Sequence, residues 1–278
     1  MSGIAGIFRR DGESARASDV VAMGAALAHR GPDADGAWCE GPAAFGHRML
    51  WSTPESLREK LPQTGAGGDY VITADARIDN RDELISALGL AGRPSVEISD
   101  SELILIAYER WGEDCPRHLL GDFAFAIWDA PRQLMFCARD HMGVRPLVYY
   151  ASGRLFAFAS EINGLLALQE GPRRLNETRM AEFLLMIAED KAITFFENVD
   201  RLPPAHTLTV TANSVRLRQY WTLDDRTELR LRSETEYAEA YRDVFTEAVR
   251  CRLRSTGGVG ALLSGGLDTS SIVCVSRE

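Results

Sequence analysis

The sequence lacks the features that mark secreted, membrane and nucleic-acid-binding proteins. No apolar run approaches the roughly 20 residues that span a bilayer. The N-terminus, MSGIAGIFRRDG, has no charged region before an apolar core and so does not resemble a signal peptide. The formal charge of −9 argues against binding along a phosphate backbone, which requires a basic surface. We therefore expect a cytoplasmic protein without nucleic-acid or membrane partners.

Cysteine and histidine are also scarce, and neither shows ligand-like spacing. The five cysteines make no CxxC pair, and the five histidines follow no metal-binding pattern. Low-complexity tracts are absent, and 45% of the residues are hydrophobic against 26% charged. The 278 residues are therefore expected to form one large or two ordinary globular domains with reduced thiols.

Apolar patterns predict a strand-rich first domain with helices at both ends. Strands are expected at Gly3–Phe8, Ala43–Trp51, Tyr70–Ile78, Gly121–Asp129, Gln133–Arg139, Leu147–Tyr150 and Leu155–Ser160, with a final pair within His206–Tyr220. Helices are expected after a capping Ser18, with the face Val20, Met23 and Leu27, and at Asn80–Leu88, Asp100–Trp111, Glu161–Leu168 and Glu177–Ala188. The helix at Asp100–Trp111 follows a capping-type start at Ser99 and Asp100. In FAFAIW, residues 123–128, both alternating faces are apolar, as in a strand buried on both sides. These patterns predict two packed sheets covered by helices.

The pattern changes after a charged stretch, Thr222 to Ser233, that is typical of a linker. A helix is expected over Glu234–Leu253, and its aromatic stripe is interpreted as core packing rather than a cofactor site. A strand at Val259–Leu263 and another helix should follow. So short a segment cannot bury its own apolar faces. We therefore expect a first domain at residues 1–222 and the truncated opening of a second at residues 223–278.

The sequence SGGLDTSS, residues 264–271, is the strongest chemical signal in the chain. A strand followed by a helix N-terminus gathers backbone N–H groups, and the helix dipole adds positive potential there. Gly265 and Gly266 allow an anion to approach the backbone, and Asp268 offers a carboxylate suited to Mg²⁺. The loop lacks the lysine of GxxxxGK[ST] and the three-glycine dinucleotide spacing. A glycine-rich turn without a ligand is the alternative interpretation.

The loop resembles the pyrophosphate loop of the asparagine synthetase B superfamily, and the likeness extends over nearly the whole chain. The matching phrases, in chain order, are HRGPD (29–33), GHRML (46–50), SDSE (99–102), YERWGEDCPRHLLGDFAFAIWD (108–129), FCARDHMGVRPLVYY (136–150), FASEI (158–162), RLPPAH (201–206) and ALLSGGLDTSS (261–271). The resemblance implies an α/β protein with an N-terminal-nucleophile (Ntn) αββα glutaminase-like domain. The start of an α/β Rossmann-like ATP-pyrophosphatase domain would follow it.

The resemblance also implies ATP and Mg²⁺ as cofactors and adenylation of a carboxylate, with release of AMP and pyrophosphate. The expected pyrophosphate-binding residues are Ser264, Gly265, Gly266, Asp268, Thr269 and Ser270. Asp268 would hold the metal ion, and Leu262 would contact the adenosine side.

The glutaminase pattern of the family is degraded in this sequence. Ser2 stands where the family has an N-terminal cysteine nucleophile, and Ser is the weaker nucleophile at neutral pH. Asp75-Ala76-Arg77 replaces Asn-Gly-Glu, which removes an oxyanion donor worth about 3–4 kcal/mol and inverts a charge in the glutamine pocket. Arg48 and Asp100 remain at glutamine-recognition positions but are interpreted as structural ion-pair residues. We therefore expect glutamine hydrolysis to be absent.

A synthetase without its own ammonia must use an amine that its substrate already carries. Lasso-peptide macrolactam cyclases do this, and MSGIAGIF, HRMLWSTPESL (47–57), ARIDNRDEL (76–84) and RLPPAH resemble them more than β-lactam synthetases. The resemblance implies a precursor peptide as substrate, with a leader peptidase and a leader-binding protein as partners. The alternatives are a glutamine-hydrolysing asparagine synthetase and a truncated, non-catalytic Ntn-like module.

Overall fold

A computed structural model describes residues 1–187, 190–224 and 226–277 and divides the chain into two compact units. The first unit contains Met1–Leu50 and Arg58–Thr222. The second contains Leu223–Glu278 together with a separate short segment, Trp51–Leu57. The break after Thr222 coincides with the end of the predicted first domain, whereas the inclusion of the short segment was not expected.

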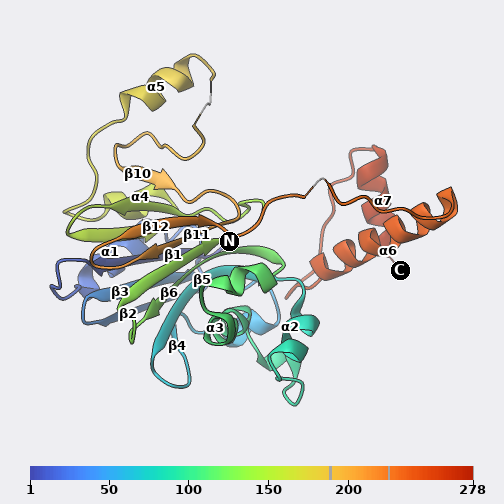
Figure 1. The fold of residues 1–278 in the computed structure, drawn as a ribbon, viewed down its shortest axis with the longest axis horizontal. Coiled ribbons are helices and arrows are strands. Elements are labelled where there is room, and N and C mark those ends of the chain that lie inside the picture. The colour runs from blue at the N-terminus through green and yellow to red at the C-terminus, as the bar shows by residue number, and fades with distance from the viewer. Residues whose placement is uncertain (188–189, 225, 278) are drawn as a thin grey trace. The chain divides into compact units, whose positions relative to one another are not determined.

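Two six-stranded antiparallel sheets form the centre of the first unit (Figure 1). The first sheet has the order β10 (Val199–Arg201), β8 (Val148–Ala151), β9 (Leu155–Ala159), β1 (Gly3–Arg9), β3 (Ala43–Met49) and β2 (Ala34–Glu40). The second has the order β12 (Val215–Gln219), β11 (His206–Val210), β7 (Leu134–Arg139), β6 (Gly121–Asp129), β5 (Tyr70–Ile78) and β4 (Gln63–Thr64). Consecutive strands pair through short connections in much of the second sheet.

Helices cover the outer faces of both sheets. On the first sheet lie α1 (Ala17–Ala26) and α4 (Ile162–Leu166), which share a buried cluster with β1, β3 and β9. On the second lie α2 (Arg81–Ala87) and α3 (Asp100–Trp111), with the short helices η2 (Ser95–Glu97) and η3 (Gly112–His118) beside them. A further short helix, η1 (Glu55–Arg58), and α5 (Glu177–Leu184) complete the elements before Thr222.

A separate apolar layer fills the space between the sheets, so β6 is buried on both faces. Phe123, Phe125 and Ile127 point into the helix-covered cluster, whereas Ala124, Ala126 and Trp128 point into the layer between the sheets. This alternation follows from the two-residue period of a strand. It confirms the prediction from FAFAIW and the expected arrangement of two packed sheets covered by helices.

Several local predictions need correction. Helix α1 begins at Ala17 with Arg16 at its N-cap, so Ser18 lies inside the helix and does not cap it. By contrast, the Ser99 side chain accepts the Glu102 N–H and caps α3, as the sequence suggested. Strands β2, β4 and β10 were not foreseen, because the exposed, polar pattern of β2 (Ala34–Glu40) carries little periodic signal. Part of the helix expected over Glu177–Ala188 lies outside the described residues.

The second unit consists mainly of α6 (Glu234–Arg252) and α7 (Leu267–Val275). The strand expected at Val259–Leu263 is absent from the described part of this unit, where residues 259–263 run without regular pairing. A strand needs a neighbour for its backbone hydrogen bonds, and no strand is assigned in this unit's described residues. The stripe on α6 is also largely uncovered there, since Tyr241 is 71% and Val244 73% exposed.

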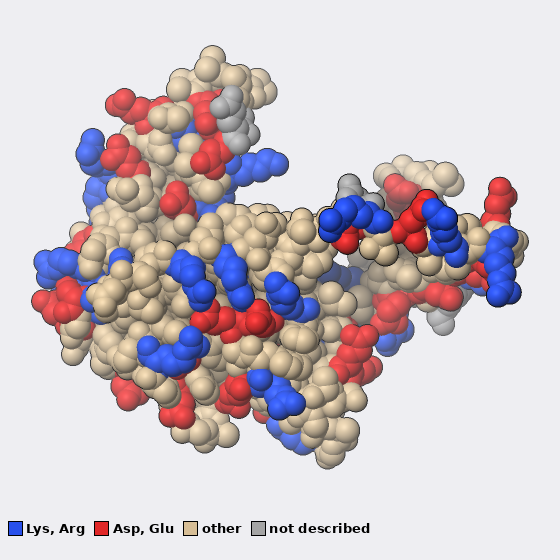
Figure 2. Space-filling model, in the orientation of Figure 1, with Lys and Arg blue, Asp and Glu red and all other residues tan. Residues whose placement is uncertain are grey.

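Positive and negative side chains are mixed over the face drawn in Figure 2. Among the helices of the described residues, none is long and apolar enough to cross a membrane.

Candidate functional site

Ser2 lies in a buried position at the start of β1, in line with Ile4, which faces the layer between the sheets. Its Oγ accepts the Leu50 N–H at 3.1 Å and lies 3.8 Å from the Met49 sulfur. Its backbone N–H donates to Asp75 Oδ1 at 3.1 Å, and its carbonyl accepts the Arg30 Nε–H at 3.0 Å. Ser2 is therefore held at all three of its polar groups by the surrounding structure.

Asp75 joins the two sheets at this point and carries a buried charge network. Its carboxylate lies 3.4 Å from Arg30 Nη2 and 3.5 Å from Arg145 Nη1. Burial raises the pKa of Asp75, and the charges of Arg145 and Arg30 offset part of that increase. Arg30 also bonds Glu161 at 2.8 Å. The space beside Ser2 is thus occupied by fixed, mutually compensating charges.

Arg30 and Arg145 were missed as site residues, although both stand inside the family-like phrases HRGPD and GVRPL. A signal for them was present in the sequence. A buried carboxylate is stable only beside a cation or several donors, so replacing an amide by Asp75 requires positive partners nearby. The sequence alone could not say which arginines approach it.

The other residues of the degraded pocket point in different directions. Arg77 lies on the same face of β5 as Asp75, and its Nε is 3.3 Å from Asp79 Oδ1. Ala76 lies on the opposite face and packs against the helix-covered core. Arg48, opposite Gly3 across the β1–β3 pairing, donates to the Gly24 carbonyl at 3.0 Å. Of these residues, Asp75 contacts Ser2, whereas Ala76 faces the helix-covered core and Arg48 lies with Gly3 on the α1 side of the first sheet.

Asp100 is engaged at the N-terminus of α3. Its carboxylate forms a buried ion pair with Arg81 and accepts the Ile78 N–H at 3.1 Å. Arg81 also donates to the carbonyls of Ser95 and Ile98, at 2.7 and 2.6 Å. These contacts tie α2, α3 and β5 together, which gives Asp100 a structural task in this chain.

His47 is buried between the sheets next to this site, on the same face of β3 as Phe45. Its Nδ1 lies 3.1 Å from Thr73 Oγ1, and burial lowers the pKa of the imidazole to about 3. A folded-state pKa below the unfolded value near 6.5 means that the unfolded chain binds the proton more readily. Stability is therefore expected to be retained above pH 6.5 and lost progressively as the pH falls toward 3.

The change His47→Gln should remove this pH dependence while it keeps a polar group near Thr73. Between pH 7 and pH 5, the wild-type chain should lose about 2 kcal/mol more unfolding free energy than the variant. Urea titrations at both pH values measure the difference. Equal losses in the two proteins would contradict a neutral buried His47.

The predicted ATP loop has an open backbone at the start of α7. Gly265 has φ +82°, and a Cβ built there would meet nothing within 4 Å. Gly266 is the N-cap of α7 and provides no side-chain cap. The Ser270 N–H donates to the Gly266 carbonyl, and the amide groups that precede Ser270 lie at the N-terminal end of the helix. Ser264 Oγ and Thr269 Oγ1 lie 3.2 Å apart.

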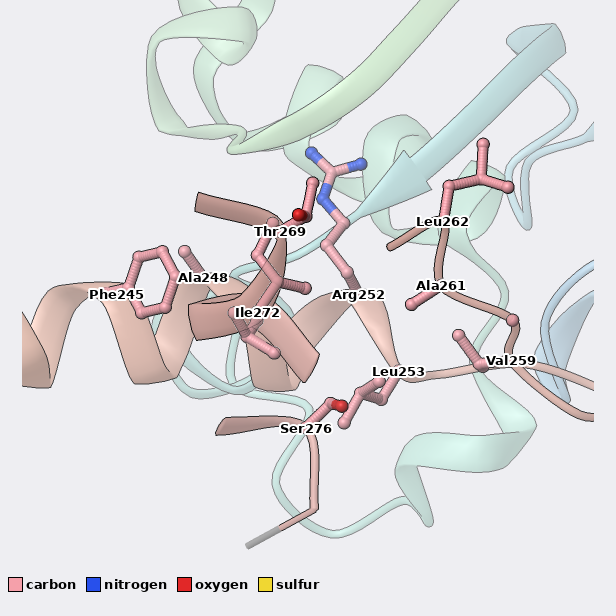
Figure 3. A pocket seen from close by; sticks show the side chains of 12 residues that line it. Phe245, Ala248, Arg252, Leu253, Val259, Ala261, Leu262, Thr269, Ile272 and Ser276 are labelled. Carbon is pink, nitrogen blue, oxygen red and sulfur yellow. The ribbon is translucent and has the colours of Figure 1, made fainter. Parts of the chain in front are cut away.

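A hollow of about 600 Å³ lies beside this loop within the second unit. Figure 3 shows Phe245 and Ala248 of α6 on one side and Val259, Ala261 and Leu262 on the other, with Thr269 and Arg252 between them. Leu262 is 95% exposed, so its side chain is available to a ligand rather than packed in the described residues.

The loop residues fit a phosphate group, and Asp268 fits a metal ion only in part. Open first-turn amides and a glycine with positive φ suit an anion. Asp268 is the acidic residue in the first turn of α7. Within residues 1–187, 190–224 and 226–277, no cluster of three or more His, Cys, Asp or Glu is placed to hold a metal. Asp268 would thus supply one oxygen ligand, with the phosphates and water supplying others.

Comparison with known proteins finds a matching family for each of two parts of the chain. Residues 1–221 match the glutamine amidotransferase domain family, and residues 240–278 match asparagine synthase. The chain is 34% identical over 252 residues to asparagine synthetase (glutamine-hydrolysing) 3 of Bacillus subtilis, covering 90% of this chain and 41% of that protein. It is 32% identical over 260 residues to amidase chry2 of Gibberella zeae, covering 88% of this chain and 37% of the amidase.

A solved structure shares the fold at low sequence identity. Glutamine phosphoribosylpyrophosphate amidotransferase from B. subtilis, complexed with ADP and GMP, gives a TM-score of 0.58 at 16% identity, over 80% of this chain and 50% of that one. This likeness bears on the fold alone and confirms the expected αββα arrangement. The chain spans about two fifths of the length of the B. subtilis synthetase. It belongs to the glutamine amidotransferase domain family, in the branch that continues into an asparagine-synthase domain.

Proposed function

We propose that this chain is part of an ATP-dependent synthetase that forms an amide bond without hydrolysing glutamine, namely a lasso-peptide cyclase. The enzyme would adenylate an Asp or Glu side chain of a precursor peptide. The N-terminal amine of the same peptide would then attack the acyl-adenylate and release AMP. The bond formed is an isopeptide C–N bond, and the bond broken is the acyl C–O bond to AMP.

The observation that carries the proposal is the carboxylate of Asp75 beside Ser2. An oxyanion site must offer hydrogen-bond donors to negative charge that develops in the transition state. Asp75 instead offers negative charge, 3.1 Å from the Ser2 nitrogen. Arg30 and Arg145 compensate that charge and are thereby engaged. A glutamine carboxamide bound here would face a carboxylate where the reaction requires a donor.

Loss of glutamine hydrolysis determines which nitrogen source remains. Without ammonia from glutamine, the acyl-adenylate must be captured by an amine on the substrate itself. The phrases HRMLWSTPESL and ARIDNRDEL resemble lasso cyclases and favour a peptide amine. A leader peptidase and a leader-binding protein would then be the partners, because the N-terminal amine must be freed before closure.

The second unit supplies the nucleotide side of the proposal. Open amides at the α7 N-terminus and the hydroxyls of Ser264 and Thr269 would bind pyrophosphate oxygens, and Asp268 would contact Mg²⁺. Bound Mg²⁺ would neutralise phosphate charge during adenylation. Leu262, at the edge of the hollow, would lie against the adenosine.

A glutamine-hydrolysing asparagine synthetase is the second candidate. It is favoured by 34% identity to a B. subtilis protein of that name. It requires Ser2 to act as the nucleophile, with its own amine as the base. Asp75 would hold such an amine close to a carboxylate, which opposes its use as a base.

Two assays on the full-length enzyme separate the candidates. We expect pyrophosphate exchange into ATP with a linear precursor peptide, little exchange with free aspartate, and no ammonia release from saturating glutamine. Ser2→Ala should leave the peptide-dependent exchange unchanged. Exchange with aspartate alone, or ammonia release that disappears in Ser2→Ala, would establish the asparagine synthetase instead. The absence of any exchange would favour the non-catalytic module.

A further inference from the structure

The Trp51–Leu57 segment belongs to the second unit and is held in a defined turn by its own hydrogen bonds. Ser56 Oγ accepts the N–H groups of Ser52 and Thr53, each at 3.1 Å, and donates to the Thr53 carbonyl at 2.7 Å. Thr53, Glu55 and Ser56 are all buried. Three hydrogen bonds on one hydroxyl hold the turn in a single conformation, which presents the Glu55 carboxylate in a fixed place.

Two contacts attach this segment to the chain that follows α6. Arg254 Nη1 lies 3.1 Å from Glu55 Oε2, with only 18% and 7% of the two side chains exposed. The Thr256 N–H donates to the Ser52 carbonyl at 3.2 Å. An ion pair this well buried interacts more strongly than a surface pair, because water screens it less.

The attachment stands immediately before a glycine-rich connection to the ATP loop. Gly257, Gly258 and Gly260 follow Thr256, and a Cβ built on any of them would meet nothing within 4 Å. Glycine leaves the backbone many conformations, so such a connection does not fix its own path. The contacts at Arg254 and Thr256 therefore restrict the positions that the start of the ATP loop can adopt.

We propose that Glu55 and Arg254 are positioning residues for the ATP site: their ion pair fixes the point from which residues 257–266 reach the α7 N-terminus. Neither side chain needs to touch the nucleotide. The ion pair would reduce the conformational freedom that ATP binding must otherwise remove, which is preorganisation. This inference rests on the proposed nucleotide role of the loop but does not depend on which carboxylate is adenylated.

The first test measures how firmly the chain before the ATP loop is attached, in the full-length enzyme without any substrate. In Glu55→Gln, exchange of the Thr256 amide, which donates to the Ser52 carbonyl, should quicken about tenfold, while exchange in β6 stays unchanged. The matched control is Glu247→Gln, which removes an exposed ion pair with Arg250 on α6. Equal exchange of the Thr256 amide in the two variants would overturn the proposal, and unchanged β6 exchange shows that the fold is retained.

The second test uses ATP dependence. Glu55→Gln should raise the KM for ATP about tenfold in pyrophosphate exchange with little change in kcat, whereas Glu247→Gln should not. The charge exchange Glu55→Arg with Arg254→Glu should restore most of the affinity. A drop in kcat at constant KM, or no recovery in the double variant, would contradict a positioning role. Either acceptor, peptide or aspartate, can be used, so failure of the cyclase proposal would remain distinguishable.

Discussion

Replacing Arg81 by Ala should lower the free energy of unfolding by about 3–5 kcal/mol. The Arg81 and Asp100 side chains are only 6% and 5% exposed, and the change leaves Asp100 buried without its cation. The carbonyls of Ser95 and Ile98 lose their donor in the same step. Urea denaturation followed by circular dichroism measures the loss.

A matched control lies close by on the same layer of helices. Arg93 pairs with Glu102 at 2.6 Å, but 44% of the Arg93 side chain is exposed. Arg93→Ala should therefore cost less than about 1 kcal/mol. If both variants lose the same stability, the buried pair does not hold α2 and α3 to β5. The double change Arg81→Met with Asp100→Leu should recover much of the loss, since it leaves no uncompensated charge.

The largest expected effect on activity is at Asp268. Under the proposed role of Asp268 as a Mg²⁺ ligand, Asp268→Asn in the full-length enzyme should reduce pyrophosphate exchange at least about 100-fold, because several kcal/mol of charge stabilisation would be lost. Increasing Mg²⁺ should recover part of the rate if the carboxylate holds that ion. A decrease below about threefold would show that the metal is bound without Asp268.

The control for this variant is Asp243→Asn, an exposed acid on α6 in the same unit. It makes the same change of charge without touching the loop. Exchange rates within about twofold of wild type are expected for it, since an exposed charge at a distance is screened by salt. A comparable decrease in both variants would indicate a general electrostatic effect rather than a ligand.

Elements with strong periodic signals could be predicted closely from the sequence. The observed bounds of β5 and β6 equal the predicted ones, and Ser99 caps α3 as expected. These elements are determined by local pattern and by burial on both faces. The sequence did not predict β2, which is largely exposed. It wrongly predicted a strand at residues 259–263, which have no partner strand in the described residues.

The residues of the candidate sites were likewise predicted only in part. The sequence identified Asp75 as an anomaly because one residue type replaced another in a known phrase. It could not identify Arg30 and Arg145, since their approach depends on contacts far apart in the chain. The ion pair of Glu55 could not be predicted either, because its partner Arg254 lies almost 200 positions later in the sequence.

The division of the second unit into two pieces constrains how this protein can be recombined with its relatives. A chimera joined after Thr222 would combine the native Arg254 with a foreign residue at position 55, since Trp51–Leu57 belongs to the second unit but is encoded with the first. Under the proposed positioning role, functional exchange of the second unit would require transfer of residues 51–57 as well. Substitutions at positions 55 and 254 should then be inherited together.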